Sequence, residues 1–435
     1  MKTSHRRDFV KQGLAGTAAM TLVNNAHADG SSSTISLALI GCGGRGRVVA
    51  EVLARLDKVE VRACCDPRKE RLASASRHLG IESKYAVSDL RKLLEDDTID
   101  AVVIATPDHW HAPAAILACD AGKHVYVEKP CSHNVREGRQ LVEAARRNDC
   151  VVQHGTQVRS TSMMIEAVQR LRDGIIGEVL AAKAWNVQHR ANIGHTQPVE
   201  VPAGIDYETW VGPAELVPFR ENLVDSAWHW AFNFGTGDMG NDGVHDIDYV
   251  RWGLGVETHP THVTGAGGKY FFDDDQQFPD TQQVTFEYPS NGRPGQQKML
   301  TYEQRLWSTN YPGGYNVDSG GEFYGTEGRM FLSRRGKIQV LDPRNQRVET
   351  GIQPKEQDLE AHARNFIDCV RTGQRPNGDI EIGHMTSSLC HLGNVATRLR
   401  RSLTLDPDRE VIPNDHEAND LLGRQYREHW GTPRV

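Results

Sequence analysis

The sequence predicts an α/β protein in which a doubly wound parallel sheet is followed by an α/β domain with an open, mainly antiparallel sheet. Three observations lead to this prediction. Short apolar runs alternate with helix-period segments between residues 34 and 155. A glycine-rich turn connects the first run to the first helix. From residue 178 onward the runs show partial two-residue periodicity, and Gly and Pro separate several of them. Regular alternation is typical of parallel sheets, and two-residue periodicity is typical of antiparallel ones.

The five apolar runs of the first region are read as parallel strands, because the loops between strands and helices are only two to six residues long. The strands are expected at 34–40, 59–65, 101–105, 124–127 and 150–153, and the helices at 48–56, 112–121 and 135–147. In such sheets function gathers at the carboxyl ends of the strands. Asp66, the segment Thr106 to His111, and the segment Glu128 to Pro130 all fall at these ends.

The glycine-rich turn runs from Gly41 to Gly46 and predicts a dinucleotide-binding Rossmann fold. The first glycine allows the tight turn, the second allows the backbone to approach a pyrophosphate, and the third allows close helix packing. Asp66 follows Gly46 by twenty residues and would accept hydrogen bonds from the ribose hydroxyls, which favours NAD. Arg68 and Arg71 leave NADP open, because either could meet a phosphate. Alternatively, they are solvated residues that open the next helix.

The second region is expected to hold a largely antiparallel sheet with two covering helices. Strands are expected at 179–187, 282–288, 298–306, 321–324, 329–333 and 337–341, and helices at 241–252 and 358–370. We divide the chain into a Rossmann domain at 34–155, a substrate-binding and oligomerisation domain at 156–400, and a C-terminal tail at 401–435. One sheet face would line a cleft and the other would be free for a partner, which predicts a homodimer or homotetramer.

The first 28 residues are expected to be a twin-arginine signal peptide. Arg6 and Arg7 precede Phe9, an apolar run covers 14–23, and Ala26-His27-Ala28 offers a cleavage site after Ala28. An ordinary secretory signal or a basic tail are the alternatives. The twin-arginine route carries folded proteins, so a cofactor could be loaded before export to the periplasm or the extracellular space.

Length, charge and cysteine spacing argue against several classes of protein. The chain has 435 residues, which is typical of two or three domains, and a net charge of −7, which argues against binding to duplex nucleic acid. Beyond the N-terminus no stretch of about 20 apolar residues could span a membrane. Eight cysteines without paired C-x-x-C spacings predict neither a disulfide framework nor a structural zinc site.

Several motifs together resemble the glucose–fructose oxidoreductase and inositol dehydrogenase (Gfo/Idh/MocA) family. The order of the glycine turn, Asp66, Thr106-Pro107 with His111, Glu128-Lys129-Pro130 and Gly243 to Asp248 is similar to that family. The segment 365–392 resembles its bacterial, often exported, branch. The resemblance implies oxidation or reduction of a secondary alcohol on a sugar, cyclitol or related polyol. The predicted contacts to a tightly bound NAD, with NADP as the alternative, are Gly41, Gly43, Gly44, Arg45, Gly46, Asp66, Arg71, Thr106, Pro107, His111, Glu128 and Lys129.

Lys129 and His245 are the first candidates for the chemistry. Beside a nicotinamide, a lysine can hold the substrate hydroxyl and stabilise alkoxide charge, and the resemblance makes Lys129 the family's E-K-P lysine. His245 is the candidate base, with Asp242 to orient it. Relatives commonly carry Asp at the position of Asn241, so Asn241 could instead bond a substrate hydroxyl. The alternatives are a surface lysine for Lys129 and a helix-capping role for His245, while Asp248 is read as structural or catalytic.

Further side chains are weaker candidates for sugar binding or for a metal. Trp185 could stack on a sugar ring, although core or oligomer packing explains it as well. Arg159 and Tyr324 could line the cleft. His109 and His111 form an H-x-H with His133 and His154 nearby in sequence, but no carboxylate or cysteine is spaced with them, and no metal is expected.

Three functions remain open at this point. The leading one is an exported NAD(P)-dependent oxidoreductase acting on a sugar or polyol. The second is an NAD-dependent glycosidase that oxidises its sugar transiently, eliminates the aglycone and reduces the sugar back. The third is a non-enzymatic binding protein stabilised by a cofactor, against which the presence of Lys129 and His245 argues.

Overall fold

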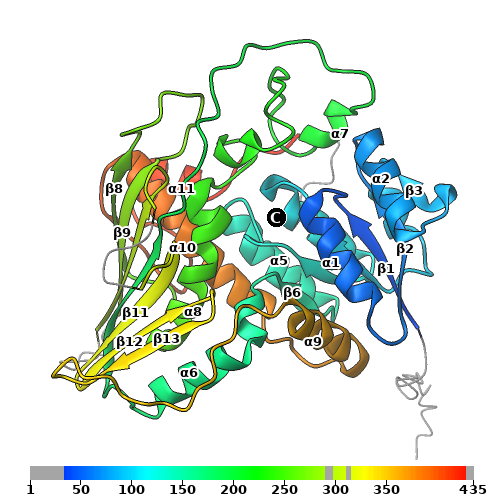
Figure 1. Ribbon diagram of the computed structural model, residues 1–435. Coiled ribbons are helices and arrows are strands. Elements are labelled where there is room, and N and C mark those ends of the chain that lie inside the picture. Colours follow the sequence, from blue (N-terminus) through cyan, green and yellow to red (C-terminus); the bar gives the residue numbers. More distant parts are fainter. Residues whose placement is uncertain (1–33, 290–296, 310–314, 428–435) are drawn as a thin grey trace, which may run out of the picture.

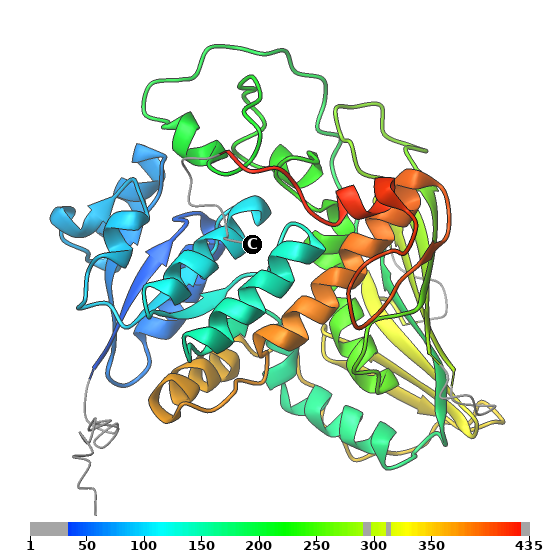
Figure 2. The same ribbon diagram turned by 180° about the vertical axis from the view of Figure 1, so that it is seen from behind.

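The computed structural model describes residues 34–289, 297–309 and 315–427, so the expected signal peptide and its cleavage site lie outside the described residues. Two sheets stand side by side with helices between them (Figures 1 and 2). Within the described ranges, no helix combines the length and apolarity needed to cross a bilayer.

The first sheet is parallel and has six strands in the order β3-β2-β1-β4-β5-β6, which confirms the Rossmann prediction. The strands are β1 (Ile35–Ile40), β2 (Val59–Cys65), β3 (Ala86–Val87), β4 (Ala101–Ile104), β5 (His124–Val127) and β6 (Val152–His154). Ile40 is paired with Cys65 on one side and with Ile104 on the other. The carboxyl ends of these three strands therefore lie at one edge of the sheet.

Helices cover both faces of this sheet. Helices α1 (Gly44–Ala54) and α9 (Leu359–Thr372) pack on one face, and α4 (His111–Asp120) and α5 (Val135–Arg147) pack on the other. Helix α9 comes from the far end of the chain, yet its side chains Ala363, Phe366 and Ile367 belong to the same core cluster as Leu37 and Leu53. The first domain is thus completed by a helix from the second half of the sequence.

The second sheet has eight strands in the order β13-β12-β11-β7-β10-β9-β8-β14. They are β7 (Val179–Asn186), β8 (His262–Gly268), β9 (Thr281–Tyr288), β10 (Lys298–Arg305), β11 (Ser319–Gly325), β12 (Gly328–Ser333), β13 (Lys337–Leu341) and β14 (Leu403–Thr404). Among the strands that the structure describes, β7 and β10 alone pair in parallel, so the sheet is mainly antiparallel, as predicted. Helix α8 (Val244–Leu254) packs on this sheet, and α10 (Ile380–Leu399) packs between the sheet and helix α5 of the first domain. Helix α6 (Ser162–Arg172) packs against α8.

A long segment, residues 187–235, leaves β7 and crosses to the first domain; we refer to it as the strap. It carries the short helix α7 (Tyr207–Val211) and runs across the top of Figure 1. The amide of Lys69 donates to the carbonyl of Gly204 at 2.9 Å, and the indole of Trp110 donates to the carbonyl of Trp210 at 3.0 Å. The strap therefore rests on the edge of the first sheet where the strands end.

Candidate active site

A cavity of about 490 Å³ opens between the two domains at the carboxyl edge of the parallel sheet. The first domain lines it with the glycine turn, the end of β4 and the segment that follows β5. The second domain lines it with the strap and with the start of α8. Of the predicted residues, the cavity brings together Gly43, Gly44, Arg45, Arg71, Thr106, Pro107, His111, Glu128, Lys129, Asn241, Asp242 and His245.

Lys129 joins the two domains across this cavity. Its Nζ donates to the backbone oxygen of Asn241 and, at 3.2 Å, to the Oδ1 atom of the same residue. Asn241 lies in a π-helical turn, Met239–Gly243, that precedes α8. An ammonium has three N–H groups, so among the described residues these two bonds leave one N–H for a substrate oxygen.

Glu128 is a buried anion that holds the glycine turn. Its Oε1 accepts a hydrogen bond from Arg45 Nε at 2.7 Å. Burial opposes ionisation, but the positive charges of Arg45 and Lys129 outweigh burial and hold the pKa of Glu128 below its usual value. Gly155 makes room for the carboxylate, since a Cβ there would lie 3.0 Å from it. Glu128 therefore positions Arg45 beside the cavity.

His245 is a neutral imidazole in the first turn of α8. Burial lowers its pKa well below the usual value, and the charges of Arg334 and Lys129 lower it further. Its Nδ1 is buried and makes no hydrogen bond within the described part of the chain. A neutral imidazole can accept a proton, so His245 is in the protonation state that a base needs.

Asp242 is held by two arginines that the sequence did not point to. Its Oδ2 accepts from Arg190, and its Oδ1 accepts from Arg334 Nη2 at 2.6 Å. Burial alone would raise its pKa, but these two charges hold the pKa far below the usual range. Within the described ranges no hydrogen bond joins Asp242 to His245, so the expected orienting contact is not made in this structure.

Arg190 and Arg334 reach the site from places that carry no recognisable motif. Arg190 follows β7 at the start of the strap, and Arg334 lies in the turn between β12 and β13. Arg190 also bonds the fully buried Asp238 at 2.8 Å. Only the three-dimensional arrangement of the sheet brings these two side chains to one carboxylate, and no sequence spacing could have found them.

The glycine turn provides a cradle that fits a pyrophosphate. A Cβ at Gly46 would lie 2.1 Å from the carbonyl oxygen of Gly41, so helix and strand are in direct contact there. A Cβ at Gly43 would meet only Arg71 Nη1, at 3.6 Å, and one at Gly44 would meet nothing within 4 Å. The amino end of α1 is therefore open to a ligand, as phosphate binding requires.

Asp66 lies at the end of β2, as the spacing predicts. Its carboxylate accepts from the amides of Cys42 and Arg68, both at 2.8 Å, and burial raises its pKa. A narrow cavity beside it is lined by Arg71 from the first domain and by Trp210 from the strap. The residues present at this edge of the sheet thus fit the two halves of an NAD molecule.

Three of the residues proposed for substrate binding are not placed in the cavity. Trp185 is fully buried and stacks on Tyr315 and Phe331. Arg159 is buried and forms a bidentate pair with Asp248 at 2.8 and 2.9 Å.

Tyr324 lies on β11 and points away from α8, whereas its neighbour Phe323 contacts Gly253 of that helix. The tyrosine hydroxyl donates to Glu322 at 3.1 Å. The arrangement gives Trp185 and Arg159 packing and ion-pair roles, and it places Tyr324 on the outer face of the second sheet.

The histidines of the H-x-H pair support the loops around the site. His111 bonds the carbonyl oxygens of Pro130 and Thr106 at 2.6 and 2.9 Å and so connects the two strand ends. His109 is buried against Phe234 of the strap, with ring centroids 4.9 Å apart.

Comparison with known proteins agrees with this architecture. Residues 35–156 match the model of the oxidoreductase family with an NAD-binding Rossmann fold, and residues 178–432 match the model of the same family's C-terminal alpha/beta domain. A glycosyl hydrolase family 109 protein of Shewanella baltica is 32% identical over 213 residues, which are 42% of this chain and 46% of the relative. An alpha-N-acetylgalactosaminidase of Shewanella oneidensis is 31% identical with the same coverage. The chain thus spans about half the length of these curated relatives.

Solved structures show the same fold at low sequence identity. The aldose-aldose oxidoreductase of Caulobacter crescentus superposes with a TM-score of 0.65 at 18% identity, covering 86% of this chain and 100% of the other. A levoglucosan dehydrogenase in complex with NADH superposes with a TM-score of 0.65 at 19% identity, covering 86% and 99%.

Proposed function

Since the chain belongs to the Gfo/Idh/MocA oxidoreductase family and has its NAD-binding Rossmann fold, we propose that it transfers hydride between a nicotinamide cofactor and a secondary alcohol of a sugar or polyol. One observation carries the proposal. Lys129 from the first domain and His245 from the second line the same cavity, next to the open cradle of the glycine turn. Solved structures with the same fold are named for aldose and levoglucosan chemistry, which supports a sugar-like substrate.

The chemistry divides between the bound cofactor and the side chains. NAD, held by the glycine turn and Asp66, would supply the hydride acceptor. The free N–H of Lys129 holds the substrate oxygen and stabilises the negative charge that develops on it. The neutral ring of His245 accepts the hydroxyl proton. The carboxylate of Asp242, fixed by two arginines, can accept hydrogen bonds from neighbouring hydroxyls of a sugar.

We propose that the cofactor is tightly held and is reoxidised or reduced in place. The strap supports this, because Trp210 covers the cavity beside Asp66 and Asp225 pairs with both Arg68 and Arg71. Because those two arginines already have a carboxylate partner, NAD is preferred over NADP. Export by the twin-arginine route would remove the enzyme from the cytoplasmic nucleotide pool, and a retained cofactor fits that location. The outer face of the second sheet is the proposed oligomer interface.

A glycosidase that works by transient oxidation is the second candidate, and the curated relatives favour it. Such a reaction needs a further base to remove a carbon-bound proton. His229 of the strap lines the cavity, stacks on Trp228 and bonds the carbonyl oxygen of Ser226, 2.7 Å away, through Nδ1. Burial lowers its pKa to about 4, so its ring is neutral and available as that base.

Two alanine variants test the site. We expect Lys129→Ala and His245→Ala each to retain nucleotide and to lose turnover by about 10²-fold or more. Lys84→Ala, at an exposed lysine of the first domain that does not line the cavity, is the matched control and should keep full turnover. Near-normal turnover of either alanine variant removes that residue from the mechanism.

The choice between the two reactions needs two readouts on protein that carries its cofactor. A change in nicotinamide absorbance on adding sugars or polyols identifies net oxidation or reduction. Release of an aryl group from aryl glycosides, without net reduction of the cofactor, identifies the glycosidase. Folded protein that neither copurifies with nor takes up a pyridine nucleotide contradicts both.

A further inference from the structure

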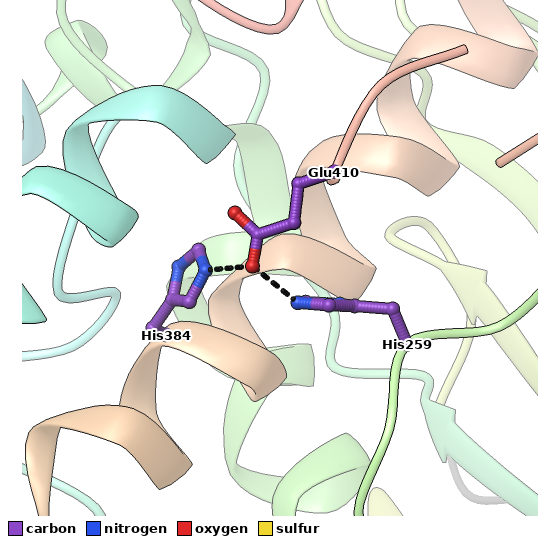
Figure 3. A group of neighbouring side chains, drawn as sticks. All are labelled: His259, His384 and Glu410. Carbon is purple, nitrogen blue, oxygen red and sulfur yellow. Dashed lines mark hydrogen bonds and ion pairs between the residues drawn. The ribbon is translucent and has the colours of Figure 1, made fainter. Parts of the chain in front are cut away.

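Two histidines and a glutamate from distant parts of the chain converge on one point away from the active site (Figure 3). The Nε2 atoms of His259 and His384 each lie 2.9 Å from the same oxygen, Oε1 of Glu410. All three potential ligand atoms lie within 4.8 Å of one another. The two rings meet edge to face with centroids 5.5 Å apart, so their nitrogens approach the oxygen from different directions. Both histidines are buried, and Glu410 is nearly so.

We propose that His259, His384 and Glu410 bind a divalent transition-metal ion of the zinc class. Two imidazole nitrogens and one carboxylate oxygen are a common zinc ligand set, and water completes the tetrahedron. In such a site the bonds of about 2.0–2.2 Å place ligand atoms roughly 3.3 Å apart. The observed separations of 2.9 Å to the carboxylate oxygen are close to that value. The two imidazole–carboxylate separations therefore need to widen only slightly to admit an ion, and the two ring nitrogens lie within 4.8 Å of each other.

The surroundings of His384 resemble the outer shell of a metal ligand. Its second ring nitrogen, Nδ1, lies 3.3 Å from the hydroxyl of Ser388, one turn further along α10. A hydrogen bond at that nitrogen fixes the ring and leaves Nε2 free for an ion. Helix α5 makes room for the ring with Gly138, where a Cβ would lie 2.3 Å from Nδ1.

Arg139 is a positively charged neighbour that opposes a cation, and its own contacts reduce the conflict. Its Nη2 and Nε atoms lie 2.7 and 3.1 Å from Oε1 of Glu410. The same Nη2 also lies 2.9 Å from Glu381. One arginine against two carboxylates leaves a net negative charge at the cluster. A carboxylate oxygen has two lone pairs, so Oε1 can meet an ion and the guanidinium on different sides.

The position of the cluster indicates a stabilising role. None of its three residues lines the active-site cavity. His259 lies in the loop between α8 and β8, His384 lies on α10, and Glu410 lies in the C-terminal segment that follows β14. An ion bound there would connect these three segments, including the loop that follows the helix carrying His245.

The test uses the full chain without an affinity tag and with its cofactor. After treatment with a chelator and dialysis against zinc, we expect about one equivalent of zinc by elemental analysis and a thermal midpoint that rises with zinc concentration. Glu410→Gln should weaken zinc binding by at least about 100-fold, because it removes the charged ligand. Ser388→Ala should weaken it about 10-fold. Glu417→Gln, whose exposed carboxylate pairs with Arg401 in the same C-terminal segment and does not contact the cluster, is the matched control and should keep the equivalent of zinc.

Each outcome either supports or overturns the proposed zinc site. Protein that retains no zinc and whose thermal midpoint does not respond to it overturns the proposal, and so does a Glu410→Gln variant that binds zinc as tightly as the parent. If that variant does not fold, cobalt(II) added to the metal-free parent replaces it as the probe. Visible d–d bands of a nitrogen- and oxygen-bound ion that zinc abolishes support the site, and their absence overturns it. Neither result depends on turnover, so failure here leaves the proposed reaction intact.

Discussion

Adding one methyl group to the glycine turn should separate cofactor binding from folding. At Gly43 a new Cβ meets only Arg71 Nη1, at 3.6 Å, which is ordinary contact. The backbone at Gly43 has φ −69°, which alanine adopts freely. We therefore expect Gly43→Ala to change the free energy of unfolding of the cofactor-free protein by no more than about 1 kcal/mol.

The same methyl group stands where the pyrophosphate must approach the backbone. Loss of one hydrogen bond to a charged group costs about 1.5–3 kcal/mol, so nucleotide affinity should fall roughly 10- to 150-fold. Gly46→Ala provides the contrast, because its Cβ would lie 2.1 Å from the backbone oxygen of Gly41, where Cβ atoms essentially never come closer than 3.0 Å. Helix α1 would have to move by about 1 Å, at a cost of about 1–3 kcal/mol and a drop of roughly 5 °C in thermal midpoint.

The assay is the nucleotide content of each purified variant, followed by titration with NAD and thermal unfolding of the stripped protein. Gly43→Ala should lose nucleotide and keep its midpoint, whereas Gly46→Ala should lose both. A Gly43→Ala protein that copurifies with as much nucleotide as the parent would refute the placement of the pyrophosphate. Equal destabilisation of the two stripped variants would refute the packing argument.

Two further predictions concern stability. Burial lowers the pKa of His109, His154 and His391 to about 3 each, against about 6.5 in the unfolded chain. Below about pH 6.5 the unfolded state therefore binds more protons than the folded state. The free energy of unfolding should decrease as the pH falls, by up to about 1.4 kcal/mol per pH unit for each histidine. Urea unfolding at about pH 7.5 and about pH 5.5 measures this, and equal stability at the two values would contradict it. Arg159→Met should cost about 3–5 kcal/mol, because it removes the arginine partner of the buried carboxylate of Asp248 and leaves it only the hydrogen bond from Thr386. KM for the substrate should stay near the parent value, and a large rise in KM with unchanged stability would return Arg159 to the substrate site.

The Rossmann half could be predicted closely from the sequence, because each of its strands, helices and turns is defined by a pattern within a few consecutive residues. Strand β5 and helix α5 begin and end at the expected residues, and the glycine turn carries its geometry within six positions. The pairing of β1 with β2 and β4 then places Asp66 and the residues after β4 at one edge without further assumptions. Residues at strand ends could therefore be placed together at this edge of the sheet from their positions in the sequence alone.

The rest of the site depends on contacts between segments that are far apart in the chain. Arg190 and Arg334 meet at Asp242 only because β7 and β12 flank β11 in the sheet. The same holds for His259 and Glu410, which are separated by 151 positions. Trp185 shows the converse, since an aromatic residue in a strand is equally compatible with a sugar platform and with core packing, and only the neighbouring Phe331 decides.

The docking of α9 on the first sheet has a consequence for protein engineering. The core of the first domain extends across the predicted boundary near residue 156, because Phe366 and Ile367 belong to the same core cluster as Leu37 of β1 and Leu53 of α1. A chimera that joined this N-terminal half to a relative's C-terminal half would pack a foreign helix into that core. Successful exchange of modules between members of this family therefore requires α9 to be transplanted together with the sheet and helix against which it packs.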